Sequence, residues 1–146
     1  MVRLAETKDI PAIVGLLRQQ IPESNLKRSR IGFSPSKSAN LVKSSINQGF
    51  ALVYENEGIS GLLLAESRLN MFSDIVSEAY MTAIFVKPEH RKGIAAGRLL
   101  KSFLSRCEET KTQLTWIGST ITSSLDEKTM NKLGFKLQEQ LYLKES

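Results

Sequence analysis

Hydrophobic positions along this 146-residue chain switch repeatedly between the period of a strand and the period of a helix. Short apolar runs bounded by Gly, Pro, Asn or Asp predict strands, and apolar residues three and four apart predict amphipathic helices. Strands are expected at residues 2–5, 50–54, 59–66, 78–86, 114–117 and 135–143. Helices are expected after Thr7, at 36–48, at 95–109, and from a capping box at 124–127 to Gly134.

Start and stop signals support these boundaries. Thr7 is a good N-cap, Gly49 and Gly134 are helix stops, and Pro88 ends a strand. The densest polar stretch, residues 23–38, is expected to be a loop between the first two helices. The sequence has no repeat, low-complexity tract or linker, so we expect a single domain over residues 1–146.

Composition narrows the class of protein. Apolar residues make up 41% of the chain, which is enough for a core, and charged residues make up 24%. A lone cysteine and a lone histidine argue against an internal disulfide and against a structural zinc site, so no metal is expected. No signal-like or membrane-length apolar run is present, and we expect a cytoplasmic protein without a membrane partner.

The net charge of +5, from 20 basic and 15 acidic residues, suits a polyphosphate ligand or an acidic partner. A nucleic-acid-associated protein is one alternative, but it would usually be more basic and would offer stacking aromatics, of which only Phe33 lies near the basic cluster. We therefore expect nucleic acid not to be the main partner. The basic cluster consists of Lys27, Arg28, Arg30, Lys37 and Lys43.

Residues 85–100 carry the most specific chemical signal: a buried strand, a proline stop, a basic loop of small residues and an amphipathic helix. Small residues let a ligand approach the backbone, and the free amides of a helix N-terminus attract phosphate. The construction suits a pyrophosphate, although an ordinary strand-loop-helix connection has the same composition, and neither common phosphate-loop motif is present.

The same segment resembles motif A of the GCN5-related N-acetyltransferases, which reads Val-x-Pro, Arg/Gln-x-x-Gly-x-Gly/Ala and a helical Leu-Leu pair. Ile94 departs from the pattern, because it occupies the first glycine position and Gly93 lies one place early. Compact members of the family, many of them encoded by bacteriophages, tolerate such a loop. The matching residues are Val86, Pro88, Arg91, Ala96, Leu99 and Leu100.

The resemblance extends over nearly the whole chain. Residues 3–17 are similar to the first strand and helix of the family, 50–66 to its second and third strands, and 129–144 to its C-terminal motif B. The fold it implies is of the α/β (α+β) class. It is a mixed, mostly antiparallel sheet of six to seven strands flanked by about four helices.

The resemblance also implies that acetyl-coenzyme A donates an acetyl group to an amine, which attacks directly without an acyl-enzyme. The pantetheine arm pairs with a splayed strand, and an N–H of that strand polarises the thioester carbonyl. Ser123 replaces a motif-B asparagine that commonly touches the cofactor. The cofactor-binding residues implied are Ile84, Phe85, Val86, Arg91, Lys92, Gly93, Ile94, Ala95, Ala96, Gly97, Arg98 and Ser123.

Family members often use a Glu before motif A as base and a motif-B Tyr as acid. Glu78 is the nearest candidate for the base, and a solvated glutamate at a strand start is the alternative. Met130 occupies the tyrosine position, so Tyr80 and Tyr142 are the candidate acids, with half-buried sheet tyrosines as the alternative. An acyl-CoA-binding module with weak or no catalysis is therefore a second alternative.

The acceptor is expected to be an amine-bearing small molecule or protein. The sequence is compatible with a homodimer as well as with a monomer. In this family the acceptor pocket is formed largely by two loops, here residues 24–35 and 69–74, and the basic first loop disfavours a polycation. His90, beside Arg91, is expected at the surface or the cofactor rim. Cys107 lies on an apolar helix face and is expected to be a packed thiol.

Overall fold

The computed structural model describes residues 1–21, 32–91, 93–118 and 125–144, and these ranges contain one five-stranded sheet in the order β1-β2-β3-β4-β5. Its strands are β1 (Val2–Leu4), β2 (Phe50–Glu55), β3 (Ile59–Leu69), β4 (Ser77–Val86) and β5 (Leu114–Trp116). The helices are α1 (Ile10–Gln20), α2 (Pro35–Gln48), α3 (Ala95–Glu109) and α4 (Glu127–Lys132), with 3₁₀ turns at Thr7–Asp9 and Pro88–His90. No helix in these ranges combines the length and apolar character needed to cross a bilayer.

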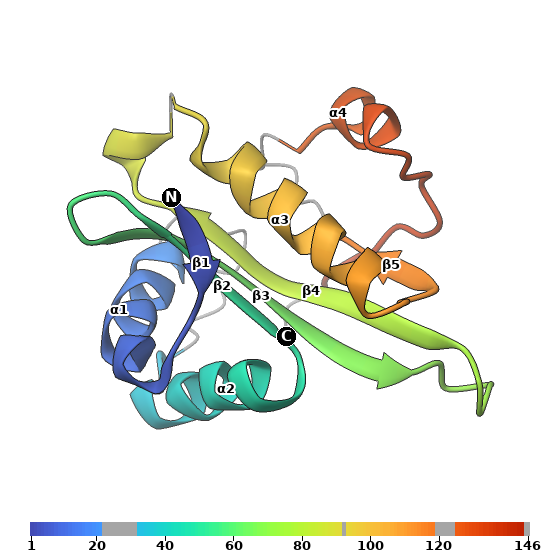
Figure 1. Ribbon diagram of the computed structural model, residues 1–146, viewed down its shortest axis with the longest axis horizontal. Coiled ribbons are helices and arrows are strands. Elements are labelled where there is room, and N and C mark those ends of the chain that lie inside the picture. The colour runs from blue at the N-terminus through green and yellow to red at the C-terminus, as the bar shows by residue number, and fades with distance from the viewer. Residues whose placement is uncertain (22–31, 92, 119–124, 145–146) are drawn as a thin grey trace.

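Helices cover both faces of the sheet (Figure 1). The first four strands are paired antiparallel and β5 runs parallel to β4, which confirms the mixed, mostly antiparallel sheet. Alternate residues of each strand point to opposite faces, so β2 and β3 contribute to two separate cores. One core lies under α1 and α2, and the other lies under α3.

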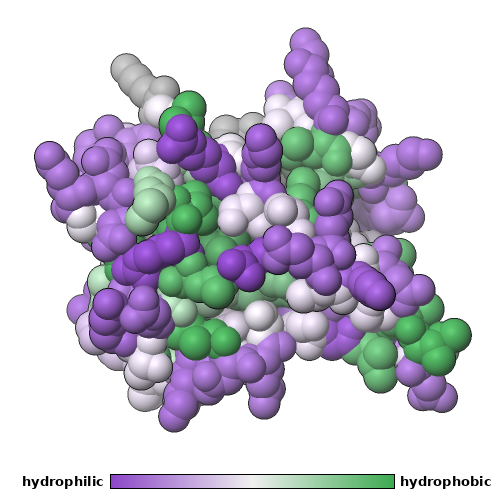
Figure 2. All heavy atoms as spheres, in the orientation of Figure 1, coloured by the Kyte–Doolittle hydropathy of each residue, from purple (hydrophilic) through white to green (hydrophobic). Residues whose placement is uncertain are grey.

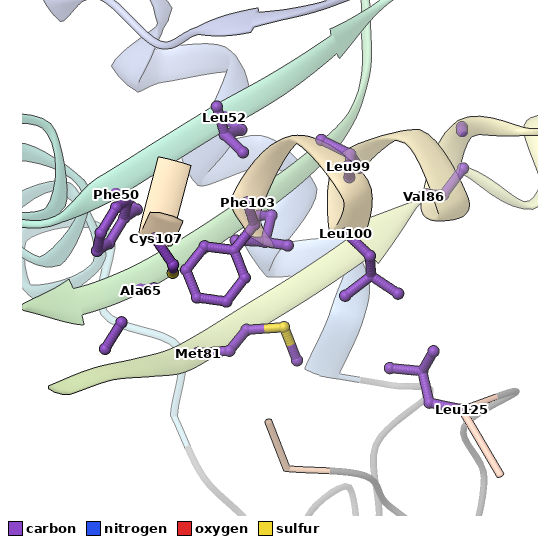
Figure 3. Packing of buried hydrophobic residues seen from close by; sticks show 13 residues of the cluster. Phe50, Leu52, Ala65, Met81, Val86, Leu99, Leu100, Phe103, Cys107 and Leu125 are labelled. Carbon is purple, nitrogen blue, oxygen red and sulfur yellow. The ribbon is translucent and has the colours of Figure 1, made fainter. Parts of the chain in front are cut away.

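The core under α3 follows the helical spacing of the sequence. Leu99, Phe103 and Cys107 recur every four residues, are buried, and point toward the sheet (Figure 3). The ring of Phe103 meets that of Phe50 edge to face with 5.3 Å between centroids. Burial raises the pKa of the Cys107 thiol above its ordinary value, so this cysteine is packed and largely protonated at neutral pH.

The predicted strand at residues 135–143 is wrong, and the described residues contain five strands where six to seven were expected for the chain. Its apolar and polar residues alternate, but alternation stabilises a strand only where an open sheet edge supplies backbone partners. Within the described chain, no ladder joins this segment to another strand. Its side chains Leu137, Leu141, Tyr142 and Leu143 are accordingly exposed.

The helix before this segment ends as the sequence indicates. Gly134 has a φ of +89° and donates its N–H to Asn131 O at 3.1 Å, while Phe135 donates to Met130 O at 2.9 Å. These two bonds form a Schellman motif, which favours glycine at the left-handed position. The N-cap is Asp126, whose carboxylate accepts the N–H of Thr129 at 2.8 Å.

The β3–β4 hairpin is longer than predicted and has an apolar tip, the green projection at the lower right of Figure 2. Its polar side chains turn inward: Asn70 Oδ1 accepts the Phe72 N–H at 2.9 Å, and Ser73 Oγ accepts the Ile75 N–H at 3.2 Å. Its apolar side chains turn outward, which reverses the usual arrangement of a loop. Those exposed are Leu69, Met71, Phe72 and Ile75.

Gly49, between α2 and β2, lies where no side chain fits, because a Cβ built there would be 2.3 Å from the carbonyl oxygen of Ala65. We expect Gly49→Ala to lower the free energy of unfolding by about 2–3 kcal/mol, as overpacking does. That loss corresponds to roughly 5–10 °C in Tm for a domain of this size. Thermal unfolding followed by circular dichroism measures it.

Gly15→Ala is the matched control, since a Cβ at this position of α1 meets no atom within 4 Å. This substitution should stabilise the protein by about 0.5–1 kcal/mol, because alanine costs less backbone entropy than glycine in a helix. Equal Tm values for the two variants would mean that the close approach of Gly49 to Ala65 does not matter for stability.

Candidate functional site

A β-bulge in β4 is the first element of the site. Leu64 of β3 pairs with Ala83, but its neighbour Ala65 pairs with Met81, so Thr82 is an extra residue without a partner of its own in β3. The Thr82 hydroxyl instead donates to the carbonyl of Leu64 at 3.2 Å. A bulge bends its strand and increases the local twist, so β4 changes direction at this residue.

The bulge also exchanges the two faces of β4. Before it, Ala79 and Met81 belong to the core under α3, and after it Ile84 and Val86 pack there. Met81 and Val86 consequently belong to the same cluster around α3, although one has an odd number and the other an even one; in Figure 3, Met81 lies below the helix and Val86 at its right-hand end. If side chains alternated strictly along the whole strand, the residues after Thr82 would be assigned to the wrong face of the sheet.

The second element is the edge of β4 beyond the end of β5, and we call the side of β4 that faces away from β3 there the gap. β5 pairs with β4 at three positions only, the last of which joins Tyr80 to Trp116. Beyond that point, within the described residues, the β4 edge that faces away from β3 has no strand beside it. We call this unpaired edge, residues 81–86, the open edge of β4.

The register shows which backbone groups face the open edge. Lys87 donates its N–H to the carbonyl of Ser60 at 2.8 Å, and the pairing continues through Gly61↔Val86 and Leu63↔Ile84. Opposed residues of an antiparallel pair exchange hydrogen bonds only at every second position. Ile84 and Val86 therefore turn their N–H and C=O groups away from β3, into the gap.

Arg91 is bound to the end of this strand. Its Nε donates to the Val86 carbonyl at 2.8 Å, and its guanidinium lies over the Phe85 ring, 5.2 Å from the centroid. This arrangement fixes the loop that leads from β4 to α3 and places a permanent positive charge beside the open edge. The motif residue is thus part of the site, through contacts that its sequence position alone does not reveal.

The N-terminus of α3 is the third element. Its N-cap is Ile94, which supplies no side-chain hydrogen bond to the first turn. The N–H groups of Ala95, Ala96 and Gly97 have no intrahelical acceptor, as in the first turn of any α-helix. Val86, Ala95 and Leu99 belong to one buried cluster, so these amides lie next to the end of the open edge.

This helix start is open to an approaching anion. A Cβ built at Gly97 meets no atom within 4 Å, and Gly93 and Arg98 are also exposed. Partial positive charge at the helix terminus and the charge of Arg98 act in the same direction. His90 is half-buried in the 3₁₀ turn that precedes this loop. Lys92 and Ser123 lie outside the described residues.

Glu78 is buried, with 4% of its surface exposed, and is surrounded by donors. It accepts hydrogen bonds from Arg68 Nε at 2.9 Å, Asn70 Nδ2 at 3.1 Å and Trp116 Nε1 at 3.1 Å. The bond from Asn70, with those from Arg68 and Trp116, holds the pKa of Glu78 below its ordinary value, although burial acts in the opposite direction. A carboxylate with this environment is a weak base that ties β3, the hairpin tip and β5 together.

The two candidate tyrosines are not brought together. Tyr80 is half-buried on β4, with the guanidinium of Arg68 over its ring at 5.2 Å from the centroid. Tyr142 is 89% exposed on the segment after α4, and its hydroxyl donates to Gln140 Oε1 at 2.9 Å. Among the described residues, no hydrogen bond or ring contact connects Tyr142 with Glu78 or Tyr80.

Several residues of the site had no signal in the sequence. Arg68, Asn70 and Trp116, which hold Glu78, come from two strands and a loop that only the fold brings together. Gln20, at the end of α1, donates its side-chain N–H to the Ile84 carbonyl at 3.3 Å. Spacing along the chain does not predict such contacts, because their partners are 8 to 64 residues apart.

Two hollows of the described surface do not coincide with the open edge of β4. One, of about 190 Å³, lies between α2 and β3 beside Gly49 and Glu66. The other, of about 440 Å³, lies along α3 beside Val2, Arg98 and Arg106. Neither hollow is lined by residues 81–86. The candidate site is therefore identified by its unpaired backbone groups and not by a surface cavity.

No protein family model and no curated protein matches this sequence. Solved structures do match over nearly the full length. A transcriptional regulator from Bacillus halodurans C-125 is 17% identical with a TM-score of 0.75, and the match covers 99% of this chain and 98% of that one. A predicted acetyltransferase from Clostridium acetobutylicum, crystallised with acetyl-CoA, is 18% identical with a TM-score of 0.72 over 99% and 95% of the chains.

A ribosomal-protein-alanine N-acetyltransferase from Brucella melitensis biovar Abortus 2308 is 13% identical, with a TM-score of 0.71 over 100% of this chain and 99% of that one. Identities this low concern the arrangement of the backbone alone. The bulged and splayed β4, the uncapped start of α3 and these matches lead to one conclusion: this chain has the fold of the GCN5-related N-acetyltransferases.

Proposed function

We propose that this chain is an acetyl-CoA-dependent N-acetyltransferase that passes the acetyl group directly to an amine. Because one fold hosts many functions, the proposal rests on the site. The observation that carries it is the open edge of β4, which leads to the uncapped first turn of α3. A strand edge followed by a phosphate-binding helix start matches a ligand that has amides at one end and a pyrophosphate at the other.

The residues present fit such a ligand in chemical type. The N–H groups of Ile84 and Val86 face the gap and suit the carbonyl oxygens of a pantetheine arm and a thioester. The first-turn amides of α3 suit the pyrophosphate, and Arg91 and Arg98 add positive charge. Bound acetyl-CoA supplies a thioester that an amine attacks. An N–H directed at the thioester oxygen stabilises the negative charge that develops there.

The proton transfers are assigned to solvent water and to the acceptor itself. Glu78 has its lone pairs engaged by three donors, and Met130 stands where the family often has a tyrosine. An alkyl amine with a pKa of ~10.4 is neutral in roughly one molecule in two thousand at pH 7. We therefore expect the rate to rise with pH in parallel with the neutral fraction of the acceptor.

Thermal unfolding with and without acetyl-CoA tests the donor half of the proposal. A ligand at a hundred times its Kd stabilises the folded state by about 2.7 kcal/mol, which raises Tm by several degrees. Thiol release from acetyl-CoA, followed with a panel of small amines and amine-bearing peptides, tests the transfer half. An unchanged Tm at millimolar acetyl-CoA would overturn the proposal.

A catalytically weak acyl-CoA-binding module is the second candidate, favoured by Met130 and by the three hydrogen bonds that Glu78 already accepts. It predicts the same rise in Tm but no thiol release above the rate without protein, whatever the amine. The acceptor, an amine on a small molecule or a protein, and a homodimer remain predictions. The apolar hairpin tip belongs to one of the two loops expected to form the acceptor pocket.

A further inference from the structure

We infer that Gln20 is a positioning residue for the acyl donor, acting through the backbone of β4. Gln20 is the last residue of α1, and its Nε2 donates to the carbonyl oxygen of Ile84 at 3.3 Å. It is partly buried, whereas its neighbour Gln19 is exposed. The inference rests on the proposed function, since it concerns how the same open edge receives a ligand.

The bond matters because it engages one of the hydrogen-bonding groups of the open edge, the carbonyl of Ile84. Ile84 and Val86 are the residues beyond the bulge that face the gap, and each brings one N–H and one C=O. Gln20 occupies the carbonyl of Ile84, and Arg91 Nε occupies that of Val86 at 2.8 Å. Within the described residues, the two N–H groups have no backbone acceptor in the gap. The hydrogen-bonding groups of the edge that are left for a ligand are therefore mainly these two N–H donors.

A backbone carbonyl oxygen has two lone pairs, so Ile84 and Val86 can each still accept one further hydrogen bond. Each N–H can be donated only once, and the two N–H groups of the edge suit the carbonyl oxygens of a thioester and of an amide arm. By bonding to the Ile84 carbonyl, Gln20 holds this part of β4 in one orientation. The same bond lowers the negative potential that the Ile84 oxygen would present to the developing negative charge of a thioester oxygen.

Three variants separate this role from simple packing. Gln20→Leu removes the donor at similar size, Gln20→Lys restores a donor on a longer side chain, and Gln19→Leu is the control on the exposed side of the same helix. Gln20→Leu should lower kcat/KM for acetyl-CoA about three- to tenfold, the usual effect of one hydrogen bond. Gln20→Lys should recover most of that loss, and Gln19→Leu should leave kcat/KM unchanged.

A second readout is specific to the acyl end of the ligand. Gln20→Leu should weaken the binding of acetyl-CoA more than that of free CoA, which lacks the thioester carbonyl. Calorimetric titration of both ligands measures the ratio of the two Kd values. Equal weakening, or no recovery in Gln20→Lys, would indicate a structural role only and would overturn the inference.

The free protein supplies an independent check. In its NMR spectrum, one side-chain NH₂ proton of Gln20 should exchange slowly with solvent and should show nuclear Overhauser effects to protons of Ile84 and Phe85. Fast exchange of both protons would overturn the inference even before any ligand is added. Wild-type protein that neither binds acetyl-CoA nor releases thiol would instead overturn the proposed function, and the NMR result would still decide the Gln20–Ile84 contact.

Discussion

Gly97→Glu is expected to abolish the rise in Tm caused by acetyl-CoA and to leave the free protein at least as stable as wild type. The new side chain starts from a position where a Cβ meets no atom within 4 Å, so it causes no clash. A glutamate in the first turn of a helix is favourable, because it lies at the positive end of the dipole. The same carboxylate would face the pyrophosphate, and such a like-charge pair costs several kcal/mol.

We therefore expect the Kd for acetyl-CoA to rise by about a hundredfold or more, since each 1.4 kcal/mol is a factor of ten. Calorimetric titration measures it directly. Gly97→Gln has nearly the same size without the charge and should lose far less affinity. Ser105→Glu adds the same charge two turns further along α3 and should bind as wild type does. If Gly97→Glu keeps wild-type affinity, the phosphates are bound elsewhere.

Glu78→Ala is expected to cause the largest loss of stability among these substitutions. It removes the acceptor of three donors at a buried position: Arg68, Asn70 and Trp116. Breaking a buried charged pair typically costs 3–5 kcal/mol, and the partial exposure of Arg68 lowers our expectation to about 3 kcal/mol. That loss corresponds to roughly 10 °C in Tm. Glu66→Ala, at an exposed carboxylate on the same strand as Arg68, is the control and should change little.

The acid limb of the stability curve should change as well. Since the pKa of Glu78 is lower in the folded protein than its ordinary 4.5, the unfolded chain binds more protons in acid. The stabilisation is therefore complete above pH 4.5 and is lost as the pH falls through the folded pKa. Asp9, whose pKa the hydrogen bond from Arg3 lowers from 3.8 to about 2, keeps its own contribution to lower pH. The difference in stability between wild type and Glu78→Ala should shrink below pH 4.5.

Glu78→Gln separates this structural role from that of a general base. A lost general base costs about 10²–10⁴-fold in rate. With its lone pairs already engaged, Glu78 should contribute less than tenfold to kcat once the variant is measured below its lowered Tm. A loss of a hundredfold or more in a folded variant would restore Glu78 as the base.

The amino-acid sequence was enough to predict the elements whose stabilising contacts are local. The stripe of Leu99, Phe103 and Cys107, the stop at Pro88 and the Schellman glycine at Gly134 all depend on neighbours within one or two turns. Their positions could therefore be predicted from spacing and residue type, and so could the basic helix start that suits a phosphate. Even so, α2 begins one residue before its predicted start, because Ser34 caps it.

Features that depend on which strands are neighbours in the sheet could not be predicted from the sequence and became known only from the folded structure. The extra residue Thr82 exists as a bulge only relative to β3, and it places Ile84 and Val86 on the same face of the sheet as Ala79 and Met81. The strand predicted at 135–143 has the right alternation but finds no edge to pair with among the described residues. The sequence left open whether Glu78 is a base or a solvated glutamate; the structure buries it, because its three donors come from β3, the hairpin tip and β5. The physical reason is the same in each case: hydrogen bonds between distant segments carry no periodic signal along the chain.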